Sequence, residues 1–322
     1  MKTINLVAVA LLLAGCGGAI NPAVPASSSA SQAAVSQPDA GVKVFTANRD
    51  GNSVVAFSNK GSGNVAPAVT IAGSKTTLSA PDALALDSKG NIFAANDSAN
   101  NVVVFGPGAN GNASPKRTIG GTKSQLGPTE GIFVDKSGNL WVSNYSGATV
   151  TEYAAGAHGN VAPIDTISGN KTQLSEPFGP AMDKQGRLFV ANGNGGNVLG
   201  FAAGASGNVA PAVTIGGNNT GLEKPFAIAF DSNGRLLVAD EDAGVLVFAK
   251  GANGNVAPVA HITGMGEAAG IIADAKDRIW VADFGFGAID EYAKNANGSA
   301  TPIRTIAGSN TTLSGPCYLG FH

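Results

Sequence analysis

The stretch GNVAPAVTI at residues 63–71 returns without change at residues 207–215. Looser copies begin at residues 111, 159, 254 and 298, and every copy has a proline at its fifth position. These prolines, separated by 48, 48, 48, 47 and 44 residues, are Pro67, Pro115, Pro163, Pro211, Pro258 and Pro302. A Gly-Asn turn before a short β-branched run is typical of a loop that enters a strand. Because the pattern recurs at a long and nearly constant period, it predicts a propeller or a repeat array.

Each period contains four short β-prone runs separated by turn residues. In one period the runs are residues 131–135, 139–144, 149–153 and 163–167, and we name the four strands a to d in chain order. Four antiparallel strands joined in this way make one propeller blade. In four periods Asp-x-x-Gly joins strands a and b, where Asp starts the turn and Gly takes its left-handed position. These aspartates could instead bind calcium, but we favour the turn interpretation.

Bulky residues keep fixed places in the repeat and predict the packing between blades. The second residue of strand b and the last residue of strand c are bulky in every period: Phe45, Phe93, Trp141, Phe189, Leu237 and Trp280, then Phe57, Phe105, Tyr153, Phe201, Phe248 and Tyr292. Strand a mixes small and large residues, as in ALAL at 83–86, which is expected next to a crowded central axis. The nonapeptide then forms the c–d turn and outer strand of its blade, and we assign it no binding role.

The order of strands predicts how the ring closes. The folded region begins near Val42 with strand b, and the sequence ends on an unpaired strand a at 318–322. The last strand can complete the first blade and remove the open sheet edges. We therefore predict an all-β fold over residues 42–322: a six-bladed β-propeller with four-stranded antiparallel blades.

Two segments carry a resemblance to a known repeat family. PDALALDSKGNIFAAN at 81–96 and PFAIAFDSNGRLLVAD at 225–240 resemble NHL repeats, with proline, small residue, apolar pair, Asp-x-x-Gly and a strand ending in Ala-Asn or Ala-Asp. The resemblance covers residues 42–322. It implies a six-bladed propeller and is far more specific for fold than for function.

The N-terminus has a different composition and predicts export. Residues 1–15 read as a lipoprotein signal peptide, with LAGC at 13–16 similar to a lipobox, so we expect a lipid such as palmitate on Cys16. An ordinary secretory signal is the alternative. Residues 16–41 are rich in Ala, Ser and Pro and are expected to be a flexible tether. In a two-membrane bacterium the resemblance to lipoproteins implies anchoring at the outer membrane of the envelope, because Gly17 rather than Asp follows the cysteine.

The overall composition limits the partners. Only 13% of residues are charged, the formal net charge is −2, and no Lys/Arg cluster stands out in the sequence. We therefore expect no nucleic-acid partner, membrane contact through the lipid anchor only, and a monomer. Besides Cys16 the chain has one cysteine, Cys317, so no disulfide is expected within the propeller.

One face of the ring varies between blades and is the predicted place of a site. The d–a and b–c connections share this variable face, and the a–b and c–d connections share the opposite turn face. Just before strand a, the six periods have Asp82, Glu130, Phe178, Phe226, Ala269 and Cys317. The loop between Ile262 and Asp274 is four residues shorter than its equivalents, which predicts a notch between blades 5 and 6.

Aromatic and acidic residues around this notch are the candidate ligand-binding residues. They are Phe226, Glu241, Asp242, Asp283, Phe284 and Phe286, with Phe178 and Tyr318 at the channel mouth. An aromatic surface next to carboxylates suits a sugar or apolar ring that carries hydroxyl or cationic groups. Two alternatives stay open: Phe178 and Phe226 could only plug the channel, and the short loop could be neutral drift.

These features favour a non-enzymatic binding or interaction module for a small molecule, glycan, peptide or envelope protein, with no cofactor. The alternative is a metal-dependent lactonase or esterase resembling the gluconolactonase type. That resemblance implies a divalent cation such as calcium, with Asp82 and Glu130 as ligands. The equivalent positions in the other four blades do not supply oxygen ligands. No histidine is placed as a general base at the variable face.

Overall fold

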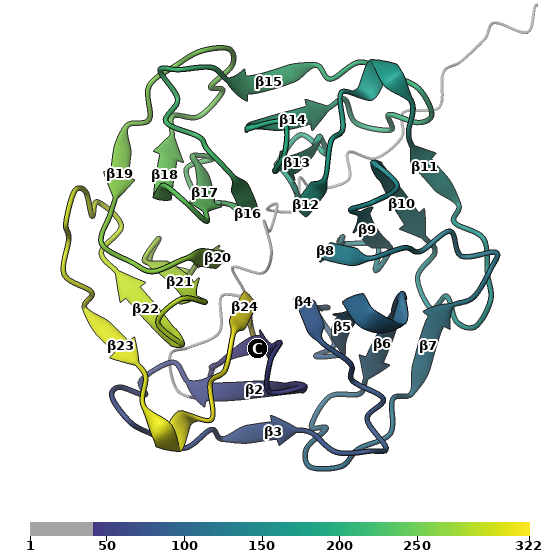
Figure 1. Cartoon of the computed structure of the whole chain (residues 1–322), viewed down its shortest axis with the longest axis vertical. Coiled ribbons are helices and arrows are strands. Elements are labelled where there is room, and N and C mark those ends of the chain that lie inside the picture. Colours follow the sequence, from purple (N-terminus) through teal and green to yellow (C-terminus); the bar gives the residue numbers. More distant parts are fainter. Residues whose placement is uncertain (1–40) are drawn as a thin grey trace, which may run out of the picture.

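The computed structural model describes residues 41–322. The predicted signal peptide and tether, including Cys16, lie outside the described residues. The described residues form six four-stranded antiparallel sheets arranged in a ring, with strand a of each sheet nearest the axis (Figure 1). The predicted all-β six-bladed propeller is confirmed.

The strands of the six blades follow one another from the axis outward. Blade 1 consists of β24 (Pro316–Phe321), β1 (Lys43–Asn48), β2 (Ser53–Ser58) and β3 (Val69–Ile71). Blade 2 consists of β4 (Pro81–Leu86), β5 (Ile92–Asn96), β6 (Asn101–Phe105) and β7 (Arg117–Gly120). Blade 3 consists of β8 (Thr129–Val134), β9 (Leu140–Asn144), β10 (Thr149–Tyr153) and β11 (Asp165–Ile167).

Blade 4 consists of β12 (Pro177–Met182), β13 (Leu188–Asn192), β14 (Asn197–Phe201) and β15 (Val213–Gly216). Blade 5 consists of β16 (Pro225–Phe230), β17 (Leu236–Asp240), β18 (Gly244–Phe248) and β19 (Ala260–Ile262). Blade 6 consists of β20 (Ala268–Ala273), β21 (Ile279–Asp283), β22 (Ala288–Tyr292) and β23 (Arg304–Ile306). Three 3-10 turns, η1 (Asp97–Ala99), η2 (Asn170–Thr172) and η3 (Ser309–Thr311), complete the structure, and no helix within residues 41–322 is long enough to cross a bilayer.

Blade 1 closes the ring with strands from both ends of the chain. Its inner strand β24 pairs antiparallel with β1, as predicted. Lys43 and His322 exchange both backbone hydrogen bonds, at 2.7 and 3.1 Å. The inner strands of neighbouring blades contact each other all around the axis. No blade is therefore left with an open inner edge.

The a–b connections are tight turns held by their aspartates. Asp87 Oδ1 accepts hydrogen bonds from the backbone N–H groups of Lys89 and Asn91, and Gly90 has a φ of 77°. Blade 6 uses Asp274 in the same way, with Asp277 in the left-handed position at a φ of 59°. This left-handed backbone is why glycine stands at the equivalent positions elsewhere.

The repeated nonapeptide connects each blade to the one before it. The N–H of Gly207 donates to Thr166 O at 2.8 Å, and Ser168 N–H donates to Gly207 O at 3.1 Å, so the loop of blade 4 pairs with the outer strand of blade 3. The next residue, Asn208, accepts a hydrogen bond on Oδ1 from Lys171 N–H at 2.8 Å. We call these bonds between the Gly-Asn pair and the preceding blade the Gly-Asn clasp. The sequence interpretation assigned the nonapeptide only to its own blade and missed the clasp.

The Gly-Asn clasp occurs at five of the six blade junctions, through Asn64, Asn112, Asn160, Asn208 and Asn255. The exception is the junction of blades 5 and 6, where the sixth copy has Ser299. The backbone bonds persist there, from Thr263 N–H to Gly298 O at 2.9 Å and from Gly298 N–H to His261 O at 2.7 Å. The loop that an asparagine would hold is the one shortened by four residues, so the substitution and the deletion occur together.

The clasp predicts a graded effect of two substitutions. Asn208→Ala removes the acceptor for Lys171 N–H and is expected to lower the free energy of unfolding by about 1 kcal/mol, the usual net contribution of one such hydrogen bond. Ser299→Ala at the equivalent position should change it by less than about 0.5 kcal/mol. Urea unfolding followed by tryptophan fluorescence measures both. Equal losses in the two variants would contradict a specific role for the asparagine.

Candidate functional site

A β-bulge near the start of each inner strand leaves one or two residues without a partner in the strand ladder. In β4 the pairing with β5 passes from Pro81 to Ala83, which leaves Asp82 unpaired. The bulged residues of the six blades are Asp82, Glu130, Phe178 with Gly179, Phe226, Ala269 and Tyr318. In blade 1 the bulge therefore falls one residue later than the predicted ring position of Cys317. Bulges redirect side chains out of the sheet plane, and here they face the central channel.

One cavity of about 220 Å³ at the variable face, which we call the mouth pocket, is bordered by five of the bulged residues: Asp82, Glu130, Phe178, Phe226 and Ala269. All six blades contribute to its lining: Arg49, Asp82, Glu130, Tyr145, Phe178, Lys224, Phe226, Glu241, Glu267, Ala269, Phe284 and Cys317. The six positions that the sequence places just before strand a all line it. The pocket therefore lies on the axis rather than only between blades 5 and 6.

One wall of the mouth pocket is acidic and comes from blades 1 to 3. Asp82 is 3% exposed, and Glu130 forms a hydrogen bond with it. Burial, together with the hydrogen bond to Asp82 and the charge of that carboxylate, raises the pKa of Glu130 far above its ordinary value. Arg49 Nε lies 3.6 Å from Asp82 Oδ1, and Arg49 Nη2 lies 4.0 Å from Asp97 Oδ2. The wall thus combines a neutral carboxyl, two carboxylates and one guanidinium.

Asp82, Asp97 and Glu130 are also the group that could hold a cation, since their oxygens lie within 4.8 Å of one another. Calcium usually takes six to eight oxygen ligands. Here Arg49 already places a positive charge against Asp82 and Asp97, and Glu130 favours its neutral form. The set therefore falls short of a calcium site unless Arg49 moves and Glu130 ionises.

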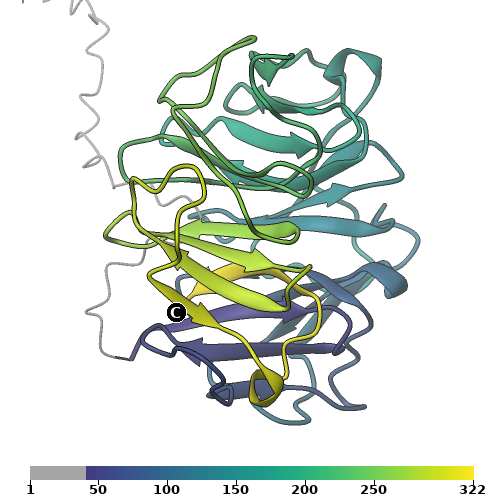
Figure 2. The ribbon, with the colours of Figure 1, turned by 60° about the vertical axis from the view of Figure 1, so that its left-hand side comes forward.

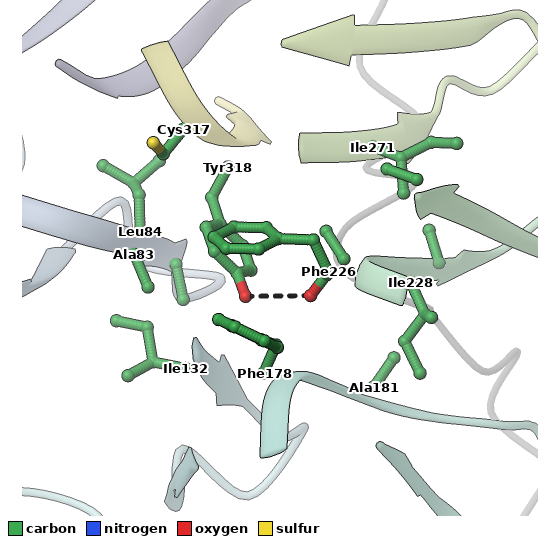
Figure 3. Packing of buried hydrophobic residues seen from close by; sticks show 14 of the residues in the cluster. Ala83, Leu84, Ile132, Phe178, Ala181, Phe226, Ile228, Ile271, Cys317 and Tyr318 are labelled. Atoms are coloured by element: carbon green, nitrogen blue, oxygen red, sulfur yellow. Dashed lines mark hydrogen bonds between the residues drawn. The ribbon is translucent and has the colours of Figure 1, made fainter. Parts of the chain in front are cut away.

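The floor of the mouth pocket is a chain of aromatic rings. Ring centroids lie 5.4 Å apart for Tyr145 and Phe178, 4.6 Å for Phe178 and Phe226, and 5.5 Å for Phe226 and Tyr318. The Tyr318 hydroxyl donates to Phe226 O at 3.3 Å (Figure 3). Leu84, Ile132, Ile228 and Ile271 surround these rings, so the channel is filled below the pocket (Figure 3).

The aromatic floor both plugs the channel and borders the pocket. Phe178 and Phe226 are 4% and 6% exposed, and Tyr318 is 3% exposed. Burial raises the pKa of the Tyr318 phenol well above its ordinary value, so this group stays protonated. The two interpretations that the sequence left open for Phe178 and Phe226 are therefore compatible.

The opposite wall comes from blades 5 and 6. Lys224 and Glu241 form an ion pair there, and their hydrogen bond raises the pKa of Lys224. Burial raises the pKa of Glu241. Glu267, which belongs to the shortened loop, and Phe284 complete this wall. The wall places hydrogen-bonding groups beside a partly exposed phenyl ring.

Three of the residues predicted around the notch do not line the mouth pocket: Asp242, Asp283 and Phe286. Asp283 is fully buried, and its carboxylate accepts hydrogen bonds from the N–H groups of Gly266 and Phe286, both at 2.9 Å. It organises the short loop and has little capacity left for a ligand. Phe286 is 68% exposed and Asp242 is exposed at the rim.

The sequence analysis did not single out Arg49, Asp97, Tyr145, Lys224 and Glu267. Arg49, Asp97 and Tyr145 directly follow the last residue of strand b, so the repeat register places them on the variable face, although they were not among the predicted binding residues. Glu267 stands two residues before the ring position of its blade, in the loop whose shortening was recognised. Lys224 gave no comparable signal, because its role depends on the pairing with Glu241 in the adjacent loop of blade 5.

Three solved structures resemble the whole ring. A chain of the nidogen/laminin complex matches with a TM-score of 0.64 and 14% identity, over 87% of this chain and 98% of that chain. A protein of unknown function from Bacteroides caccae gives 0.63 and 11%, over 87% and 98%. A candidate 6-phosphogluconolactonase from Bacteroides uniformis gives 0.56 and 14%, over 86% and 87%. The chain matches no protein-family model and no curated protein. At these identities the likeness shows the propeller fold alone.

The raised pKa of Glu130 predicts a pH-dependent effect of Glu130→Gln. The folded protein binds this proton more tightly than the unfolded chain, so the wild type loses stability relative to the variant as pH rises above about 4.5. In the presence of a chelator, the variant should melt roughly 2–4 °C higher than the wild type at pH 8 and at nearly the same temperature at pH 4. Glu223→Gln, at an exposed carboxylate on the same face, is the control. A variant that melts lower at pH 8 would contradict a neutral Glu130.

Proposed function

We propose that this protein is a non-enzymatic binding module that holds a small ligand in the mouth pocket. The observation that carries the proposal is the convergence of all six blades on one cavity. Aromatic side chains and a few converging polar groups are typical of small-molecule sites. Variation among otherwise equal blades is concentrated on the same face.

The lining favours a sugar or another ring that carries several hydroxyl groups. Glu241 and Glu267 can accept hydrogen bonds from hydroxyls, while Arg49 and Lys224 can donate them. Phe284 and Tyr145 are partly exposed and offer ring faces for stacking. Peptides and envelope proteins are less favoured, because a cavity of about 220 Å³ admits only a small group.

The groups at the pocket favour binding over catalysis by a nucleophile. Cys317 is the nucleophilic side chain in the lining, but burial raises the pKa of its thiol well above the ordinary value. His261 contacts Ala243 O at 2.7 Å in an outer strand, and His322 lies beside Gly90 on the turn face. Within residues 41–322, no histidine lines the mouth pocket.

Ligand binding tests this proposal directly. A thermal-shift screen of monosaccharides and short oligosaccharides should identify a ligand, and calorimetry then gives its affinity. Phe284→Ala and Glu241→Gln should each weaken binding by about 1–3 kcal/mol. Phe286→Ala and Asp242→Asn, which alter the same loops outside the pocket, serve as matched controls. Equal losses in the controls would place the site elsewhere.

A metal-dependent lactonase or esterase is the second candidate, favoured by the three converging oxygens of Asp82, Asp97 and Glu130. One solved relative in fold is a candidate 6-phosphogluconolactonase. Metal analysis of the purified protein separates the two candidates. A stoichiometric divalent cation lost in Asp82→Asn, together with lactone hydrolysis, would favour the enzyme.

We further infer that the repeats are of the NHL type and that the protein is a lipoprotein, anchored through Cys16 at the outer membrane of a bacterial envelope. The lipobox-like LAGC at 13–16 and the Ala/Ser/Pro-rich segment at 16–41 support this inference. It places the mouth pocket outside the cytoplasm.

Cys16→Ser tests the anchor. Without the thiol no lipid can be attached, so the variant should leave the membrane fraction or accumulate as an unprocessed precursor. Cell fractionation and the mass of the N-terminal peptide measure this. Cys317→Ser is the control, because its thiol lies inside the propeller. A mature lipidated form of the Cys16→Ser variant would contradict the anchor.

A further inference from the structure

Eight exposed lysines lie on the turn face. Four of them stand in a–b connections and four in c–d connections, so the antiparallel strand order brings all eight to the same ends of the sheets. They are Lys89, Lys136, Lys184 and Lys276, then Lys60, Lys116, Lys250 and Lys294. Every blade contributes at least one lysine of this set, and blades 2 and 6 contribute two each. The sequence spreads these residues over 235 positions, from 60 to 294, which is why no basic cluster stands out in it.

The aspartates of the same turns are buried or half-buried and are used within the connections. Asp183, Asp231 and Asp274 each pair with the arginine four residues later, at 2.6–2.7 Å, and accept backbone hydrogen bonds within their turns. Within residues 41–322, no exposed Asp or Glu stands in an a–b or c–d connection. Within residues 41–322, the exposed charged side chains of these connections are therefore positive.

The basic charge is densest in a groove between blades 2 and 3. This groove has a volume of about 500 Å³, and four cations line it, Lys89, Lys116, Arg117 and Lys136, together with the turn carboxylates Asp87 and Asp135. Arg117 lies over the Phe93 ring, 5.4 Å from its centroid, which orders one of the four cations. The groove is large enough for a phosphate group that approaches from the turn face.

The opposite, variable face has a different balance. Its connections expose the carboxylates of Asp50, Glu223, Asp242 and Glu267. Its exposed lysines lie in the loops after the outer strands of blades 1 to 3: Lys75, Lys123 and Lys171. The charge of the molecule is thus arranged along the ring axis, with the basic side opposite the mouth pocket.

The chain enters the propeller on the basic side. Lys43, at the start of β1, pairs with His322, and the His322 ring lies against the a–b turn of blade 2 at Gly90. Figure 2 shows the start of β1 and the C-terminus on the same side of the ring. Residues 17–42 separate Cys16 from Lys43, so a lipid on Cys16 would connect the propeller to the membrane from this side.

We propose that the turn face binds anionic lipid headgroups, with the groove of blades 2 and 3 taking a headgroup phosphate. A single acyl chain gives weak membrane binding, and a basic surface is the usual second attachment. The choice of a lipid surface rests on the proposed anchor at Cys16, whereas the basic face itself does not. Bound in this way, the ring presents the mouth pocket away from the membrane.

The experiment compares two triple variants in a chain of residues 17–322, so that neither the apolar segment at 6–15 nor an attached lipid contributes. Lys89, Lys116 and Lys136 are changed to Gln in one variant. Lys75, Lys123 and Lys171 are changed to Gln in the other, which alters the net charge by the same amount on the opposite face. Cosedimentation measures binding to vesicles of phosphatidylglycerol mixed with phosphatidylcholine, and to vesicles of phosphatidylcholine alone.

The turn-face variant should lose about 100-fold in binding to the anionic vesicles, because each of the three lysines near such a surface contributes about fivefold. The control variant should lose less than about threefold, and binding should weaken with salt. Equal losses in the two variants, or equal binding to neutral vesicles, would overturn the proposal. Displacement by inorganic phosphate, or stronger binding to RNA than to vesicles, would also overturn it by assigning the face to another anion. Sugar binding in the mouth pocket should be unchanged in both variants, so a failure here differs from a failure of the proposed function.

Discussion

Every part of this structure depends on burial of the sheet faces between neighbouring blades. A four-stranded sheet with bulky residues on its faces, such as Phe93 and Trp280, is stable only when another sheet covers it. The Gly-Asn clasp joins outer strands at the rim, and the inner strands meet at the axis. The same constraint explains why β24 must return to complete blade 1, since an incomplete blade would leave two neighbours exposed. The ring must therefore close for the hydrophobic core to be covered.

The pocket arises from a local departure from regular pairing. One bulge per inner strand turns a side chain toward the axis, and six such side chains meet where the ring is narrowest. Blade 1 departs further, because Tyr318 adopts a φ of 47°, a conformation that costs a residue with a side chain about 1–2 kcal/mol. Gly270 permits this, since a Cβ there would lie 2.6 Å from Tyr318 N. The surrounding blades thus hold Tyr318 in place as the plug beneath the pocket.

The two faces of the ring show opposite uses of repetition. On the turn face the same hairpin recurs, and its aspartates are used for turn hydrogen bonds and arginine pairs, so the exposed lysines set the charge. On the variable face the loops differ, and the differences meet in one cavity. The shortened loop between blades 5 and 6 illustrates this. It lacks the residues that an asparagine holds at the other junctions, and it contributes Glu267 to the pocket. A uniform surface and a specific site can therefore coexist in one small ring.

The sequence by itself determined the fold, because a period of 44–48 residues, alternating apolar runs and Asp-x-x-Gly turns are local patterns that admit few architectures. It also placed the six residues before strand a on one face, since repeat register fixes equivalent positions. Only the tertiary structure decided which loops meet at the axis: it brought Glu241 and Phe284 from the predicted notch into a central pocket and turned Asp283 inward to its own loop. It also brought the eight exposed lysines of the a–b and c–d connections together on the turn face. The physical reason is that these contacts and charges join residues from different blades, whose distances depend on how the ring closes and not on their separation along the chain.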